Sequence, residues 1–113
     1  MNIDSYRWDE TAAGTNSGAQ ADHTAEASSN GSSPKTHVIT SISGHTDLDG
    51  LIQILGGAAG ATVIWESSID VSAEGFSFNF PGLNVHGDPG IAISGHIVGS
   101  TANCQVNISG YSL

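Results

Sequence analysis

The chain has 113 residues, enough for one domain, and its 11 acidic and 2 basic residues give a formal charge of −9. That charge repels phosphate backbones and anionic lipid surfaces, so it excludes nucleic-acid binding through basic patches and argues against membrane binding. The single cysteine, Cys104, excludes an intrachain disulfide, and no apolar run is long enough to span a bilayer.

Residues 1–35 form a polar segment whose composition predicts an extended N-terminal arm. They contain ten apolar residues, six of them alanine, and residues 11–33 contain no Val, Ile, Leu, Phe, Trp or Tyr. Such a stretch buries too little apolar surface to offset its ordering entropy. We therefore expect a neighbouring subunit or partner to order the arm.

The tip of this arm is its most apolar part and is the predicted partner-binding site. Ile3, Tyr6 and Trp8 cluster there around Arg7. Aromatic residues and arginine dominate the energetics of protein interfaces, so this tip is expected to dock in a groove of a neighbouring molecule. The alternative is an ordinary chain terminus without a binding role.

Residues 36–113 have the alternating apolar and polar pattern of β-strands. Strands are predicted at residues 36–43, 51–55, 61–66, 75–80, 91–98 and 104–108. In the first of these, Val38, Thr40 and Ile42 are expected to share one face. In residues 75–80 all the phenylalanines fall on one face, and residues 104–108 alternate apolar with polar side chains.

Glycine and proline mark the predicted turns between these strands. Residues 56–60, 73–75, 81–82 and 88–90 are turn-formers, and residues 99–103 are expected to close a final hairpin. The only helical candidate is residues 47–55, which Asp49 could cap. Its β-branched residues and the glycines that follow favour a strand.

The number and spacing of these strands predict the fold class. Six to eight short strands joined by tight turns indicate an all-β fold, either a small antiparallel β-sandwich or a jelly-roll-like domain over residues 36–113. The arm, residues 1–35, would extend from it. A domain this small is marginally stable alone, so we expect oligomerisation or capture on a larger assembly.

One loop carries a potential cation site. Alternate residues of an extended loop point the same way, so His45, Asp47 and Asp49 could converge on a cation. The spacing resembles a calcium loop only superficially, because the position of the bidentate acid falls on Gly56. A polar turn between strands is the favoured interpretation.

A second histidine group could hold zinc or nickel. His86 and Asp88, together with His45 or His96 across the sheet, have suitable ligand atoms, above all on a symmetry axis. Solvent-exposed or hydrogen-bonded histidines are the favoured interpretation. We therefore predict no metal and no other cofactor.

Catalytic patterns are weak throughout the chain. There is no Gly-x-Ser-x-Gly nucleophile elbow. Cys104 falls at an apolar phase of its strand, which is typical of a small core residue. Glu66, Asp70 and Glu74 could supply paired carboxylates, but all three are typical of solvent-facing acids. The sequence predicts no catalytic residue, and we expect the protein not to be an enzyme.

Trp65 is a candidate ligand-binding residue, because an exposed indole can serve as a platform for sugar stacking. Its neighbours Val63 and Ile64 favour burial in a core or an interface instead.

A polar arm precedes an all-β domain rich in Ser, Gly and Asn that ends in a predicted hairpin closing on residues 105–111, Gln-Val-Asn-Ile-Ser-Gly-Tyr. In composition and arrangement, the chain resembles the small β-sandwich capsid decoration (cement) proteins and related virion surface proteins of tailed bacteriophages. The resemblance implies a non-enzymatic structural role, often as a homotrimer, with the major capsid protein or other virion subunits as partners. It also implies assembly in the host cytoplasm, which fits the expected lack of a secretory signal.

We therefore expect a structural protein of the virion surface that binds a capsid and reinforces it through its β-domain and arm. The alternative is a carbohydrate- or receptor-binding β-sandwich module of a phage fibre or spike, in which Trp65 contacts the ligand.

Overall fold

The computed structural model describes residues 7–14, 18–24, 34–56, 62–70, 77–98 and 103–113. These residues form nine strands: β1 (Arg7–Gly14), β2 (Ala19–His23), β3 (His37–Thr46), β4 (Gly50–Gly56), β5 (Thr62–Ile69), β6 (Ser77–Phe80), β7 (Val85–His86), β8 (Ile93–Val98) and β9 (Cys104–Ser112). Among the described residues, no helix is long and apolar enough to cross a membrane.

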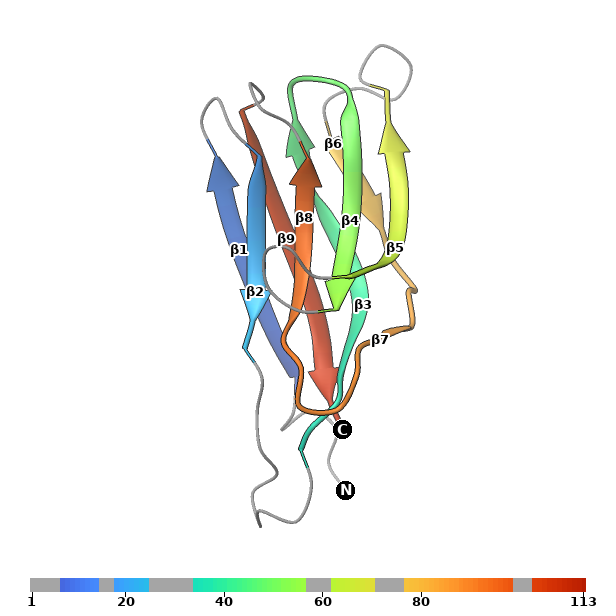
Figure 1. Cartoon of the computed structure of the whole chain (residues 1–113). Coiled ribbons are helices and arrows are strands. Elements are labelled where there is room, and N and C mark those ends of the chain that lie inside the picture. Colours follow the sequence, from blue (N-terminus) through green and yellow to red (C-terminus); the bar gives the residue numbers. More distant parts are fainter. Residues whose placement is uncertain (1–6, 15–17, 25–33, 57–61, 71–76, 99–102) are drawn as a thin grey trace.

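Two antiparallel sheets pack face to face as a sandwich (Figure 1). Sheet A has the order β1-β9-β3-β6, with the short strand β7 also paired to β3, and sheet B has the order β2-β8-β4-β5. The predicted all-β sandwich is therefore confirmed.

The pairing of the strands is nested, and this nesting gives the topology. β4 pairs with β5, β3 pairs with β6 and β7, β2 pairs with β8, and β1 pairs with β9. The chain thus runs as one long two-stranded ribbon that crosses between the sheets at each step, which is the topology of a jelly roll. The expected final hairpin over residues 99–103 is wrong, because β8 lies in sheet B and β9 lies in sheet A.

The N-terminal segment departs most from the sequence-based expectation. Instead of leaving the domain as an arm, β1 pairs along β9 and β2 pairs along β8. Ala19 and Ala21 are buried, with 5% and 2% of their surface exposed. Large side chains are not needed here, because backbone pairing to an existing sheet supplies the hydrogen bonds and small side chains fill the inner layer. The expected boundary at residue 35 does not separate these strands from the sandwich.

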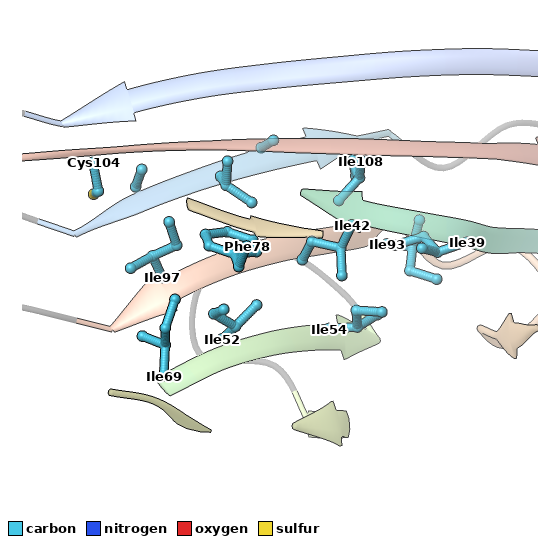
Figure 2. Packing of buried hydrophobic residues seen from close by; sticks show 13 residues of the cluster. Ile39, Ile42, Ile52, Ile54, Ile69, Phe78, Ile93, Ile97, Cys104 and Ile108 are labelled. Carbon is cyan, nitrogen blue, oxygen red and sulfur yellow. The ribbon is translucent and has the colours of Figure 1, made fainter. Parts of the chain in front are cut away.

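The core lies between the two sheets and consists mainly of isoleucine (Figure 2). Ile42 and Ile108 of sheet A face Ile52 and Ile97 of sheet B, and all four are essentially fully buried. β-branched side chains suit this position because they pack well on a pleated surface and lose little rotamer freedom in a strand.

A bulge in β3 changes which of its residues face the core. The register with β9 shifts between Ile39 and Ser41, so Ile39 and Ile42 both join the core cluster. The expected common face of Val38, Thr40 and Ile42 is therefore wrong: Thr40 is only partly buried, and Val38, although buried, lies outside the cluster. A bulge shifts the period of two by one residue, which an alternation pattern does not reveal.

Other expected elements are confirmed where the structure describes them. Residues 50–56 form a strand and not a helix. β9 buries alternate residues along its whole length, and Phe78 and Phe80 both pack at the core. Ile91 is an exception, since it precedes β8 and is exposed.

Candidate functional site

A group of polar and aromatic side chains joins β1, β2, β3 and β9 at the end of the sandwich where β1 begins and β9 ends. We call it the Trp–His cluster, and its members are Trp8, Glu10, His23, His37 and Ser112. The register of the strands places them together, because Trp8 lies opposite Gly110 on β9 and His37 lies opposite Ser112.

Gly110 makes room for the tryptophan. A Cβ at this position would lie 2.9 Å from Cζ2 and 3.0 Å from Cη2 of Trp8, and would also collide with the carbonyl oxygen of Val38. The indole therefore lies close to the β9 backbone, where any larger residue at position 110 would push it away.

The rings of the cluster form a continuous stack. The His23 imidazole lies parallel to the Trp8 indole, with 4.1 Å between the ring centroids and 7° between the planes. The His37 ring meets His23 edge-on, with centroids 4.6 Å apart. Offset and edge-on contacts of this kind are the favoured geometries of aromatic pairs. They hold β1 and β2, which belong to different sheets, against β3.

Within the cluster, the donor and acceptor of one hydrogen bond determine those of the next. His37 Nε2 lies 2.8 Å from the carbonyl oxygen of Thr24, which can only accept, so Nε2 carries the hydrogen. In the neutral ring, Nδ1 then accepts from the Ser112 hydroxyl at 2.6 Å. The Ser112 oxygen in turn accepts from Trp8 Nε1–H at 3.0 Å. Every polar atom in this chain of bonds has a partner.

His23 faces an acid at the rim of the cluster. Its Nδ1 lies 2.7 Å from Oε2 of Glu10, and 15% of the His23 side chain and 36% of the Glu10 side chain are exposed. When His23 is protonated this contact is an ion pair, and partial exposure keeps its contribution to stability small. It fastens β2 to β1 across the side of the sandwich.

The cluster contains a serine–histidine pair, but its burial prevents nucleophilic catalysis in this conformation. Ser112 is 2% exposed and His37 is 0% exposed, so no substrate atom can approach the hydroxyl. On its other side, Nε2 of His37 bonds to the backbone carbonyl of Thr24. The arrangement is a buried polar junction that fixes strand positions.

The predicted partner-binding residues divide between described and undescribed parts of the chain. Ile3 and Tyr6 lie outside the described residues. Arg7 is exposed at the start of β1, opposite Tyr111. Trp8 packs within its own domain, which differs from the expected intermolecular anchor, because His23, His37 and Ser112 already surround its ring.

The residues proposed for a cation site belong to separate interactions. His45 and Asp49 are exposed. Asp47 Oδ1 accepts from the backbone N–H of Asn103 at 2.8 Å and so braces the turn after β3 against the start of β9. Among the residues that the structure describes, no group of three or more His, Cys, Asp and Glu side chains could hold a metal ion.

The remaining histidines also lie apart from one another. His86 is exposed and contacts Oδ1 of Asn84. His96 lies on the outer face of sheet B, where its Nδ1 is buried and has no hydrogen-bond partner in the described part of the chain. Burial lowers the pKa of His96, and the negative charge of Asp22 partly opposes this shift.

The side chains considered for catalysis lie apart, in the core, on the outer face of sheet B and after β5. Cys104 is buried in the core, and its burial raises the pKa of the thiol, to which the nearby Asp47 carboxylate adds. Glu66 accepts a hydrogen bond from the Gln53 amide at 2.7 Å on the outer face of sheet B. Asp70 is exposed just after β5. Glu74 lies outside the described residues.

Trp65 lies at the open side of the sandwich, opposite the side where β1 and β2 meet. It is half-buried, packs against the core cluster and meets Phe80 edge-on, with ring centroids 5.2 Å apart. This position agrees with the interpretation of Trp65 as a core-packing residue.

No protein-family model matches the chain, and neither the curated proteins nor the solved structures contain a match. The site therefore stands on its own geometry. Sequence reasoning missed the Trp–His cluster because its members are far apart in the chain, and only the strand register brings them together. The lone tryptophan within a stretch poor in large residues was the one local signal.

Proposed function

We propose that this chain is a non-enzymatic structural protein of a virion, which binds a capsid and reinforces it as a decoration or cement protein. The strand order is the observation that supports the proposal, because jelly rolls with this wrapping recur in viral capsid domains. The link between this fold and the role is one of analogy.

The way of binding that we propose differs from the arm-based one. Residues 7–14 and 19–23 are strands of the sandwich, so the surface that meets a partner belongs to the folded domain. The exposed large apolar residues of sheet B are Leu51, Val63, Ile64 and Val98. They lie toward the two ends of β4 and β5, since Leu51 pairs opposite Val98 and Leu55 pairs opposite Val63. We assign the shell contact to this sheet.

Reinforcement would follow from mass action. A protein that binds only the assembled lattice stabilises the lattice by an amount that grows with its free concentration over the dissociation constant. By the resemblance we also propose a homotrimer, for which light scattering of the 11.5 kDa chain is the direct test.

The test of the function uses particles purified from the source that expresses the gene. Mass spectrometry should find the chain in many copies per particle, and stripping it should lower the temperature at which the shell disassembles. Absence of the chain from purified particles would overturn the proposal.

The rival role, a carbohydrate-binding module of a fibre or spike, also occurs on jelly rolls. No contact observed here favours it, because the Trp65 ring is engaged with Phe80. Saccharide binding that is lost in Trp65→Ala, with the fold intact, would support the rival role.

A further inference from the structure

We propose that the free edge of β5 accepts an extended, basic segment of a partner polypeptide, which adds to sheet B as a fifth strand. The inference rests on the proposed function in one respect only, that a shell subunit supplies the segment. The recognition mode is β-strand addition, in which backbone hydrogen bonds give affinity and alternate side chains give specificity.

Strand β5 forms an open edge of sheet B. β5 ends the order of sheet B and pairs only with β4, so its outer backbone faces no strand among the described residues. Figure 1 shows it on the side of the sandwich away from β1 and β2. The β1 and β2 edges are held together by the Trp8–His23 stack and the Glu10–His23 contact. β6 is only four residues long and is followed by Pro81.

The sequence of β5 lacks the residues that commonly protect an edge strand. β5 has eight residues and contains neither lysine nor proline, the residues that commonly protect an edge. Its register with β4 is regular from Trp65 to Ile69. The bulge opposite Leu55 leaves Val63 and Ile64 with 44% and 39% of their surfaces exposed. A partner strand could pair with the five regularly paired residues from Trp65 to Ile69 and contact the exposed Val63 and Ile64 beyond them.

The negative charge of this chain favours a basic partner over a second copy of the chain. On the outer face of sheet B, Glu66 lies on β5 itself, and none of the described residues of the sheet's strands is Lys or Arg. Gln53, which donates to Glu66, is uncharged. The Glu66 charge is therefore left for a partner strand to neutralise, whereas a second copy would bring another net charge of −9.

The two faces of β5 define the side chains of the added strand. On the outer face Glu66 lies opposite Gln53, and on the inner face Trp65 lies opposite Ile54 beside Phe80. Because side chains alternate along a strand, the partner segment should alternate Lys or Arg on the outer face with Val or Ile on the inner face.

The test uses a short synthetic peptide in which Lys alternates with Val, added to the full-length protein. We expect the peptide to slow hydrogen exchange at those amides of residues 65–69 that point away from β4. Two control peptides separate the contributions: one has every backbone nitrogen methylated, which blocks strand pairing along both of its edges, and the other has Glu in place of Lys. Both should bind at least about tenfold more weakly, since each removes backbone pairing or charge attraction.

Two protein variants then separate a site at β5 from general attraction to an acidic protein. Glu66→Lys should weaken binding of the Lys peptide about tenfold, because it places like charges side by side. Asp88→Lys makes the same change in net charge at an exposed position before β8, which β4 separates from β5, and should leave the affinity nearly unchanged. Equal weakening by both variants, protection outside residues 65–69, or tight binding of the methylated peptide would each overturn the inference. A dimer of the free protein that protects residues 65–69 would assign the edge to a second copy and would also overturn it.

These outcomes are independent of the particle analysis above. If the peptide protects β5 and the chain is absent from particles, the edge is a docking site and the virion role is wrong. If the chain is present in particles and β5 is unprotected, the virion role stands and this inference fails.

Discussion

At the residue scale, the Ser112 hydroxyl connects three strands. It bonds to His37 Nδ1 on β3 and accepts from Trp8 Nε1–H on β1. We expect Ser112→Ala to lower the free energy of unfolding by about 1–3 kcal/mol, because it removes two hydrogen bonds from the cluster, one of them buried. Urea unfolding followed by tryptophan fluorescence measures the change. Ser109→Ala is the matched control, since that hydroxyl bonds to Asp9 at the surface of the same strand. An equal effect of both variants would contradict the interpretation of the cluster as a junction.

Gly95 of β8 packs directly against side chains of sheet A. A Cβ there would collide with Cγ2 of Ile108 and lie 3.2 Å from Cδ1 of Ile42. Gly95→Ala should therefore destabilise the fold by about 1–3 kcal/mol through overpacking. At Gly56 the nearest side-chain atom would be 3.6 Å away, so Gly56→Ala should cost much less. Thermal unfolding of the two variants compares them directly, and a Gly95→Ala protein as stable as the parent would show that the sheets can separate locally.

His96 makes folding stability depend on pH. Burial holds its pKa in the folded protein below the ordinary value of 6.5, so the unfolded chain takes up the proton first. Stability from neutral His96 is therefore fully present above that value and is lost as the pH falls through the lowered pKa. We expect His96→Gln to flatten the fall in stability between pH 7 and pH 5, measured by urea unfolding at each pH. His86→Gln, at an exposed histidine, should leave the slope as it is.

At the scale of strands, the sequence predicted β9 well and β1 and β2 poorly. In β9, Cys104, Val106 and Ile108 alternate with polar residues, and this pattern survives because one face is buried along its length. In β2 the inner residues are Ala19 and Ala21, whose size carries almost no periodic signal. A prediction from composition considers only the apolar surface that a segment can bury by itself. β1 and β2 instead add to sheets whose other strands supply most of the buried surface.

Residues 7–23 should accordingly be required for folding. A chain truncated to residues 36–113 loses β1 and β2, which removes Trp8 and His23 and exposes the edges of β9 and β8. We expect this protein to aggregate or to unfold without cooperativity, as followed by circular dichroism and sedimentation. A chain that begins at residue 7 keeps every described strand and is the control. A soluble, cooperatively folded 36–113 fragment would restore the arm interpretation.

At the scale of the whole molecule, the sequence predicted the class and left the strand order open. Alternation shows that residues form strands, but the pairing of β1 with β9 joins residues about a hundred positions apart. No local pattern encodes such a pairing, and the candidate cluster depends on it. Dominance of non-local pairs also predicts slow folding relative to helical domains of this size.

The charge imbalance should make the fold sensitive to salt. With 11 acidic residues against 2 basic ones, the folded state concentrates like charges that salt screens. We expect sodium chloride to raise the midpoint of thermal unfolding by several degrees at neutral pH. Sodium chloride is preferable to sulfate, which also strengthens apolar burial. A midpoint that falls with salt would mean that attractive charge pairs outweigh the repulsion.

The antiparallel pairing of the first and last strands has a mechanical consequence. Arg7 lies opposite Tyr111, so β1 begins where β9 ends and the two extremities of the sandwich lie side by side. A pull that separates them loads one hydrogen-bonded pair at a time, as in opening a zipper, and does not shear the whole ladder at once. The domain would then yield to small forces applied through its extremities, however stable it is at equilibrium. Attachment through the broad face or the β5 edge would spread the same tension over many bonds.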